Sequence, residues 1–127
     1  MGATRDVALT DLGFRGISIN DATNGSAAVT VVPSDSGVMF VNEYASATTY
    51  TLPAVADGKG KWFWFYNVGA GGIVVTGLTA CLVGLNNAAA TTITFSTTSE
   101  MIGAGCFMQC DGTNYFVTPF AGTAAYA

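Results

Sequence analysis

The sequence predicts an all-β fold: a small antiparallel sandwich or barrel of about eight or nine short strands, with an extended N-terminal arm. Short β-prone runs recur along the 127 residues and are bounded by Gly, Asn, Asp and Pro. Helices are disfavoured because the chain has 16 glycines and many β-branched residues, with no sustained 3.6-residue apolar period. Such closely spaced strands are typical of sandwiches and barrels.

Residues 1–25 are predicted to be the arm, and residues 26–127 a single β-domain. Most predicted strands of the domain are rich in β-branched or aromatic residues and are bounded by turn-forming residues. The nine runs, of which 81–85 is the weakest, are 28–32, 38–42, 48–52, 62–67, 73–76, 81–85, 92–96, 101–110 and 115–118. We find no convincing internal repeat.

Three turns between these runs have recognisable chemistry. Residues 57–60 (DGKG) and 69–72 (GAGG) supply glycines that tolerate positive φ. Residues 111–114 (DGTN) join two strong runs and therefore predict a hairpin.

The arm has few, widely spaced apolar residues, so it could bury little surface by itself. We expect it to become ordered against another protein. The alternatives are a frayed terminus or a first strand of the domain, because residues 16–20 (GISIN) alternate in polarity. The residues predicted to make the contact are Arg5, Val7, Leu9, Leu12, Phe14, Arg15 and Ile17.

The most unusual run is residues 62–67, which begins with five consecutive aromatic residues. Side chains alternate along a strand, so Trp62, Trp64 and Tyr66 share one face, while the intervening residues share the other. One face can fill the core, but an exposed second face would form an apolar patch that monomers seldom tolerate. A loop or the arm could cover that face, or it could bind sugar rings. We favour burial against neighbouring subunits, with these predicted interface residues: Trp62, Phe63, Trp64, Phe65 and Phe107.

Residues 101–110 (MIGAGCFMQC) also alternate. The predicted core face carries Ile102, Ala104, Cys106, Met108 and Cys110, so the two cysteines are interpreted as small buried hydrophobes. On the other face, Gly103 and Gly105 leave room for another backbone or a bulky side chain.

Composition excludes several function classes. The net charge is −4 with only four Lys and Arg residues, which disfavours binding to nucleic acid. No apolar run approaches the ~18 residues of a membrane span. The chain has no His and none of the common catalytic motifs. We therefore expect no enzymatic activity, no catalytic or metal-binding residues and no cofactor, with a small hydrolase as a weak alternative.

The run from residue 34 to 120 resembles a small β-domain found in virion proteins of tailed bacteriophages. The matching features are Ser36-Gly37 before a strand, Leu52-Pro53 at the end of one, an apolar strand closing on Asn67 before Gly69, and the sequence DGTNY at 111–115. The resemblance implies a trimeric all-β module without enzymatic activity. The aromatic run 62–66 departs from the family, which usually has a more mixed strand there.

The resemblance leads to the expectation of a capsid decoration (cement) protein on the outer surface of the virion capsid. Its expected partners are itself, as a homotrimer, and the major capsid protein. Fibre proteins usually carry an attachment shaft, which we do not expect in this chain. The alternative is a receptor- or glycan-binding module of a tail fibre or spike, with Tyr44 and Tyr115 stacking on sugars.

Overall fold

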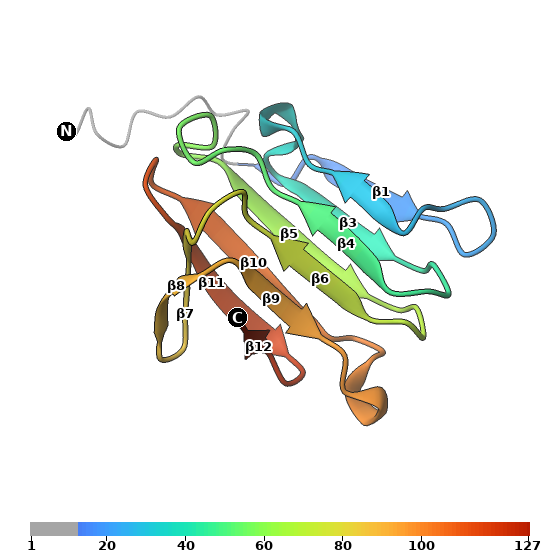
Figure 1. The fold of residues 1–127 in the computed structure, drawn as a ribbon. Coiled ribbons are helices and arrows are strands. Elements are labelled where there is room, and N and C mark those ends of the chain that lie inside the picture. Colours follow the sequence, from blue (N-terminus) through green and yellow to red (C-terminus); the bar gives the residue numbers. More distant parts are fainter. Residues whose placement is uncertain (1–12) are drawn as a thin grey trace.

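A computed structural model of the chain describes residues 13–127, which form two β-sheets packed face to face. The larger sheet has seven strands in the order β1-β3-β5-β10-β11-β7-β8, and the smaller has five in the order β12-β9-β6-β4-β2. Figure 1 shows β4, β6 and β9 in one layer, with β3, β5 and β10 in the other. The predicted all-β sandwich is thus confirmed.

The elements of the described residues follow one another with short connections. The strands are β1 (Gly16–Asn20), β2 (Ala28–Thr30), β3 (Val38–Asn42), β4 (Thr48–Thr51), β5 (Trp62–Asn67), β6 (Ile73–Thr76), β7 (Leu82–Gly84), β8 (Asn87–Ala90), β9 (Thr92–Phe95), β10 (Gly105–Cys110), β11 (Tyr115–Ala121) and β12 (Ala125–Tyr126). Two 3-10 turns, Pro33–Asp35 and Thr98–Glu100, complete the set.

The sheets are mixed, which corrects the prediction of antiparallel sheets with eight or nine strands. Parallel pairing joins β1, β3 and β5 in the larger sheet, and β2, β4 and β6 in the smaller. The later strands pair mostly antiparallel, including the predicted hairpin between β10 and β11. Periodicity could not distinguish these arrangements, because side chains alternate in the same way in parallel and antiparallel strands.

The first half of the chain winds through three coils that alternate between the two sheets. β1 and β2 form the first coil, β3 and β4 the second, and β5 and β6 the third. Successive coils stack in register, with Ser18 opposite Phe40 and Phe40 opposite Phe65. This is a structural repeat that the sequence analysis did not find, because the two offsets differ and few residues recur.

A column of three asparagines, of which Asn42 and Asn67 are buried and Asn20 is half-buried, links the three coils at the ends of β1, β3 and β5. Asn20 Nδ2 donates to Asn42 Oδ1 at 2.8 Å, and Asn42 Nδ2 donates to Asn67 Oδ1 at 2.9 Å. Asn67 Nδ2 then donates to the carbonyls of Gly69 and Met101 at 2.8 and 2.9 Å. Because Asn42 and Asn67 are fully buried, these bonds replace the water that both amides lose on folding.

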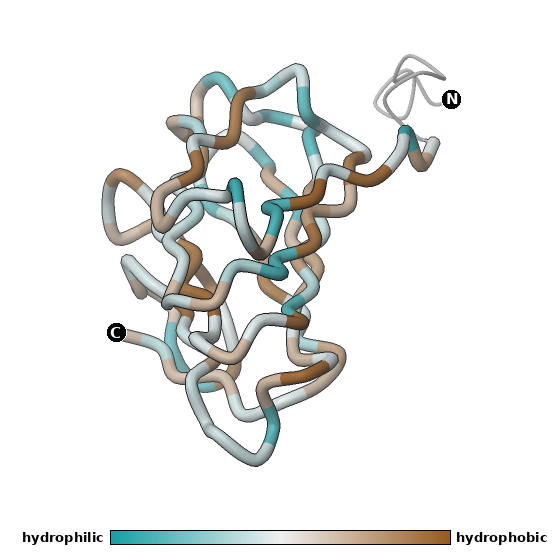
Figure 2. The backbone as a smooth tube through the Cα atoms, turned by 90° about the vertical axis from the view of Figure 1, so that its right-hand side faces the viewer, coloured by the Kyte–Doolittle hydropathy of each residue, from teal (hydrophilic) through white to brown (hydrophobic). Residues whose placement is uncertain are grey.

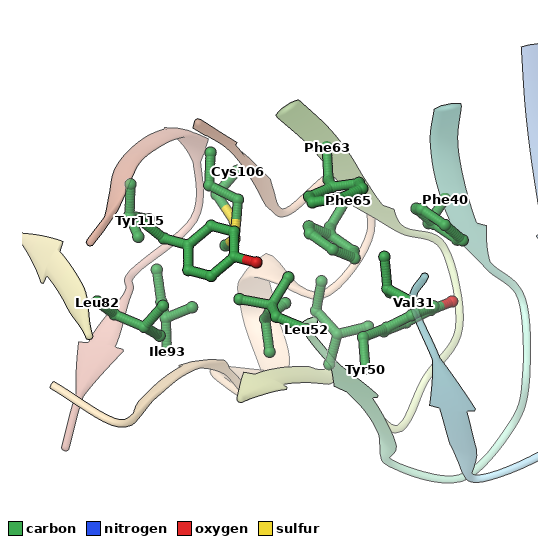
Figure 3. Close-up of a cluster of buried hydrophobic side chains, with 14 of the residues drawn as sticks. Val31, Phe40, Tyr50, Leu52, Phe63, Phe65, Leu82, Ile93, Cys106 and Tyr115 are labelled. Atoms are coloured by element: carbon green, nitrogen blue, oxygen red, sulfur yellow. The ribbon is translucent and has the colours of Figure 1, made fainter. Parts of the chain in front are cut away.

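The core lies between the sheets and is made of alternate residues from each strand (Figure 3). Phe63 and Phe65 of β5 are completely buried there. On the predicted core face of 101–110, Ala104, Cys106, Met108 and Cys110 are buried, but Ile102 precedes β10 and is 80% exposed. Figure 2 shows hydrophobic and hydrophilic positions interspersed along the chain path.

The predicted arm ends inside the domain. Its residues 16–20 form β1, which pairs along its whole length with β3 and lies at the edge of the larger sheet. This arrangement matches the alternative in which GISIN is a strand of the domain. Residues 1–12 of the arm lie outside the described residues.

Candidate functional site

The outward face of the larger sheet carries no charged side chain across five neighbouring strands. The core residues of β5 point between the sheets, so Trp62, Trp64 and Tyr66 point outward. Strand register extends this face to both sides, with Trp64 opposite Met39 and Phe107. We call it the aromatic face; its members are Ile17, Ile19, Met39, Val41, Trp62, Trp64, Tyr66, Phe107, Gln109, Phe116, Thr118 and Phe120.

The rings of the aromatic face contact one another. Trp62 packs on Phe107 with ring centroids 5.2 Å apart. Phe120 lies between two neighbours, edge-on to Trp64 at 6.0 Å and stacked on Tyr66 at 5.9 Å. Edge-to-face and offset-stacked pairs at these distances are the favourable aromatic arrangements. These contacts orient the rings of the aromatic face relative to one another.

Phe120 reaches this position because of a β-bulge and a glycine. The register between β10 and β11 shifts between Gly105 and Cys106, so Phe120 has no direct partner and its ring lies over Gly105. A Cβ atom on Gly105 would come within 2.7 Å of Phe120 Cζ and would overlap the Phe65 carbonyl oxygen. The prediction of space for a bulky side chain above this glycine is confirmed.

Much of the exposed apolar surface gathers on or beside this face. Trp62, Trp64 and Tyr66 are only half-buried. In residues 13–127, ten large hydrophobic side chains are exposed, and five of them lie here: Phe14 (54%), Ile17 (58%), Ile19 (56%), Phe116 (46%) and Phe120 (44%). Contiguous apolar patches of this kind mark interaction sites more often than chance.

Two predicted interface residues belong to the core instead. Phe63 and Phe65 have no exposed surface, because they pack between the sheets against Tyr115 and against Phe40 and Tyr50. A second subunit could not reach them. The prediction that Phe63 and Phe65 lie at an interface is therefore wrong, because alternation along β5 places both side chains on its core-facing side.

The described residues of the predicted capsid-binding arm contact their own domain. Phe14 packs edge-on against Trp64 at 6.3 Å, so the arm partly covers the aromatic face. Arg15 Nη1 donates to the carbonyls of Ser34 and Ser36 at 2.8 and 3.3 Å. Ile17 lies on β1 and is exposed. The remaining predicted contacts, Arg5, Val7, Leu9 and Leu12, lie outside the described residues.

Tyr115 cannot stack on a sugar. Its side chain has no exposed surface and its hydroxyl donates to the Pro53 carbonyl at 2.7 Å. Tyr44 is half-buried, and its backbone carbonyl lies against Gly69. The glycan-binding alternative therefore loses one of its two predicted aromatic contacts.

The cysteines have the character of core residues. Cys81, Cys106 and Cys110 are buried and unpaired. Burial raises the pKa of the Cys106 and Cys110 thiols, which keeps them protonated and unreactive at neutral pH. Within residues 13–127, no three His, Cys, Asp or Glu side chains are grouped to hold a metal ion.

Comparisons of the chain with protein-family models, curated proteins and solved structures find no match. In the part of the chain that the structure describes, no helix is long and apolar enough to cross a membrane.

Proposed function

We propose that this chain is a structural virion protein of a tailed phage, a capsid decoration protein that self-associates and binds the outer capsid surface. The homotrimer is the favoured assembly. The observation that carries the proposal is the aromatic face, twelve outward positions on five strands with no charge among them. Its role in the virion rests on the resemblance to phage β-domains.

The aromatic face supports self-association because its burial is energetically favourable. Each buried Å² of apolar surface contributes ~25 cal/mol, so a few hundred Å² supply several kcal/mol before the cost of association. Tyr66 and the two tryptophans suit an interface because each ring ends in a polar group. Trp64 Nε1 is buried and has no hydrogen-bond acceptor in the described residues.

Capsid binding by such an oligomer would be multivalent. Each subunit needs only a weak contact with the major capsid protein, since linked contacts raise the overall affinity without new interactions. Bridging between neighbouring capsid subunits would then stabilise the head.

Light scattering of the purified chain tests the self-association. We expect a mass of about 39 kDa, three times the chain mass of 13.0 kDa. The double variant Phe116→Glu, Phe120→Glu places charge on the aromatic face and should give a folded monomer. Leu78→Glu is the matched control, because Leu78 is 62% exposed and lies in the loop between β6 and β7, outside the twelve positions of that face. A monomeric wild-type chain, or an oligomer unaffected by the double variant, would overturn the proposed interface.

Binding to purified heads that lack the protein tests the virion role. The wild-type chain should sediment with the heads and raise their resistance to heat. Failure to bind heads, with selective binding on a glycan array, would favour the tail-appendage role instead.

A further inference from the structure

The first coil of the fold leaves an open hollow at the end of the sandwich. The hollow has a volume of about 130 Å³ and lies where the edge strands of both sheets meet. We call it the coil-end hollow; its lining residues are Ser18, Ile19, Asn20, Val29, Phe40 and Tyr50.

The hollow is the space that an aromatic side chain fills in the other two coils. The inward column across the larger sheet runs from Phe65 to Phe40 to Ser18. The Phe40 and Phe65 rings stack at 5.4 Å, and Ser18 puts a small hydroxymethyl group where a third ring would continue the stack. A cavity of about 150 Å³ accommodates a benzene ring, so the hollow is close to the size of the missing side chain.

A second observation shows that the hollow is incomplete. Tyr50 is 1% exposed, lines the hollow, and its hydroxyl has no hydrogen-bond partner in the described residues. Figure 3 shows this hydroxyl directed away from the centre of the cluster, on the side opposite Leu82 and Tyr115. Buried hydroxyls are usually satisfied, so the Tyr50 hydroxyl marks this end of the core as incompletely packed; an inserted phenyl ring would fill space here without accepting its hydrogen bond.

The edge beside the hollow can accept a further strand. Within residues 13–127, no strand pairs with the outer edge of β1. The strand lacks two of the features that commonly protect an edge, because GISIN has no charged residue and no proline. The asparagine column, by contrast, already ends in bonds within the chain. Asn20 Nδ2 donates to the Ser26 carbonyl, and the Ser26 backbone N–H donates to Asn20 Oδ1.

We propose that β1 accepts an extended segment of a partner protein, which adds a strand and inserts an aromatic side chain into the coil-end hollow. The partner must supply the ring, because residues 1–12 contain no Phe, Tyr or Trp. A second copy is a poor source, since its most exposed phenylalanines, Phe14, Phe116 and Phe120, lie on or against the aromatic face. This inference does not depend on the partner being a capsid protein.

The sequence of the chain's own β3, which places Phe40 in the ring column, provides the probe. A fluorescein-labelled peptide with the sequence of residues 37–43, GVMFVNE, should bind the full-length chain in a fluorescence anisotropy titration. A peptide with Ser in place of Phe should bind at least tenfold more weakly. Replacing the peptide's Asn with Ala should have little effect, because the asparagine column is already closed. Equal binding by the Phe and Ser peptides, or no binding by either, would overturn the proposal.

Filling the hollow from within the chain provides the complementary test. Ser18→Phe should raise the melting temperature by about 5 °C and weaken peptide binding at least tenfold. Ile17→Phe is the matched control, because it adds a ring to the opposite face of the same strand and should leave peptide binding unchanged. A lower melting temperature for Ser18→Phe would show that the hollow does not accommodate a ring and would overturn the proposal. Should this variant fail to fold, the peptide comparison still decides.

Two further measurements test whether the chain's own N-terminus or a second copy of the chain occupies the coil-end hollow. If deletion of residues 2–12 raises peptide affinity tenfold or more, the chain's own N-terminus competes for the hollow and the proposal is wrong. If folded Ser18→Phe loses self-association, a second copy occupies the hollow, which would also overturn the proposal. Loss of self-association through the aromatic-face variants alone leaves it unaffected, so the two proposals fail separately.

Discussion

The buried side chains of Asn42 and Asn67 are joined by a 2.9 Å hydrogen bond from Asn42 Nδ2 to Asn67 Oδ1. The two residues lie opposite each other on the parallel strands β3 and β5. Their bond aligns the second coil with the third, and Asn20 adds the first coil to the same column. A one-residue slip of either strand would turn its asparagine out of the core and break the column.

The asparagine column predicts a large effect of Asn42→Ala. This change removes the central amide, leaves the buried Asn67 Oδ1 without its donor and takes one acceptor from the half-buried Asn20. Because each unsatisfied buried polar group costs about 1–3 kcal/mol, we expect the free energy of unfolding to fall by roughly 3 kcal/mol. Urea denaturation measures it. Asn24→Ala, at an exposed loop position, should change stability by less than about 0.5 kcal/mol.

The two most buried tyrosines should respond oppositely to loss of the hydroxyl. Tyr115→Phe removes the 2.7 Å bond to the Pro53 carbonyl and should lower the free energy of unfolding by about 1 kcal/mol. Tyr50→Phe removes a buried hydroxyl that has no partner in residues 13–127 and should leave stability unchanged or slightly higher. Thermal unfolding of the two variants checks this. A Tyr50→Phe variant as unstable as Tyr115→Phe would contradict it.

Stability should fall under alkaline conditions. Burial raises the pKa of the Cys106 thiol above its usual 9.0 and the pKa of Tyr50 and Tyr115 above the usual 10.0. As pH rises above 9, the unfolded chain releases protons that the folded chain retains, so the free energy of unfolding decreases. The full contribution is present below pH 9. Denaturant midpoints measured from pH 7 to 11 should stay level and then fall, less steeply in Cys106→Ala than in the wild type.

Gly105→Ala should be destabilising although the glycine lies in a strand. The added methyl group would overlap the Phe65 carbonyl oxygen and crowd the Phe120 ring. We expect a loss of about 2 kcal/mol, within the usual range for overpacking. Chemical denaturation gives the value. Adding Phe120→Ala to Gly105→Ala should not restore the lost stability, because the overlap with the backbone remains. Full recovery of stability would show that the added methyl group clashes with the Phe120 ring alone.

Two deletions separate the predicted capsid-binding role of the arm from the structural role of β1. Removing residues 2–12 leaves β1 in place, so we expect a folded oligomer that no longer binds capsids. Removing residues 2–20 also deletes β1 and Asn20, exposing β3 and one end of the asparagine column. We expect this longer deletion to unfold at lower temperature by circular dichroism. Capsid sedimentation with the 2–12 deletion decides the arm's role, and retained binding would count against it.

Local pattern in the sequence was sufficient to predict several features. The alternation of residues 62–67 separated Phe63 and Phe65 from Trp62 and Trp64, and the burial of the first pair follows it. The core character of Cys106 and the space above Gly105 were predicted in the same way. These features depend on the two-residue period of a strand, which is a property of neighbouring residues.

The sequence by itself determined most of the strands and the core-facing side of the clearest ones, although β8 and β12 were not predicted. Only the tertiary structure decided that successive strands wind into stacked coils, because parallel pairing joins residues 21, 22 or 25 positions apart without a recognisable repeat. The asparagine column and the coil-end hollow exist only in that stacking. Their constituent residues, Asn20, Asn42, Asn67 and Ser18, have no distinguishing local pattern, since each acquires its role from the neighbour that the fold places beside it.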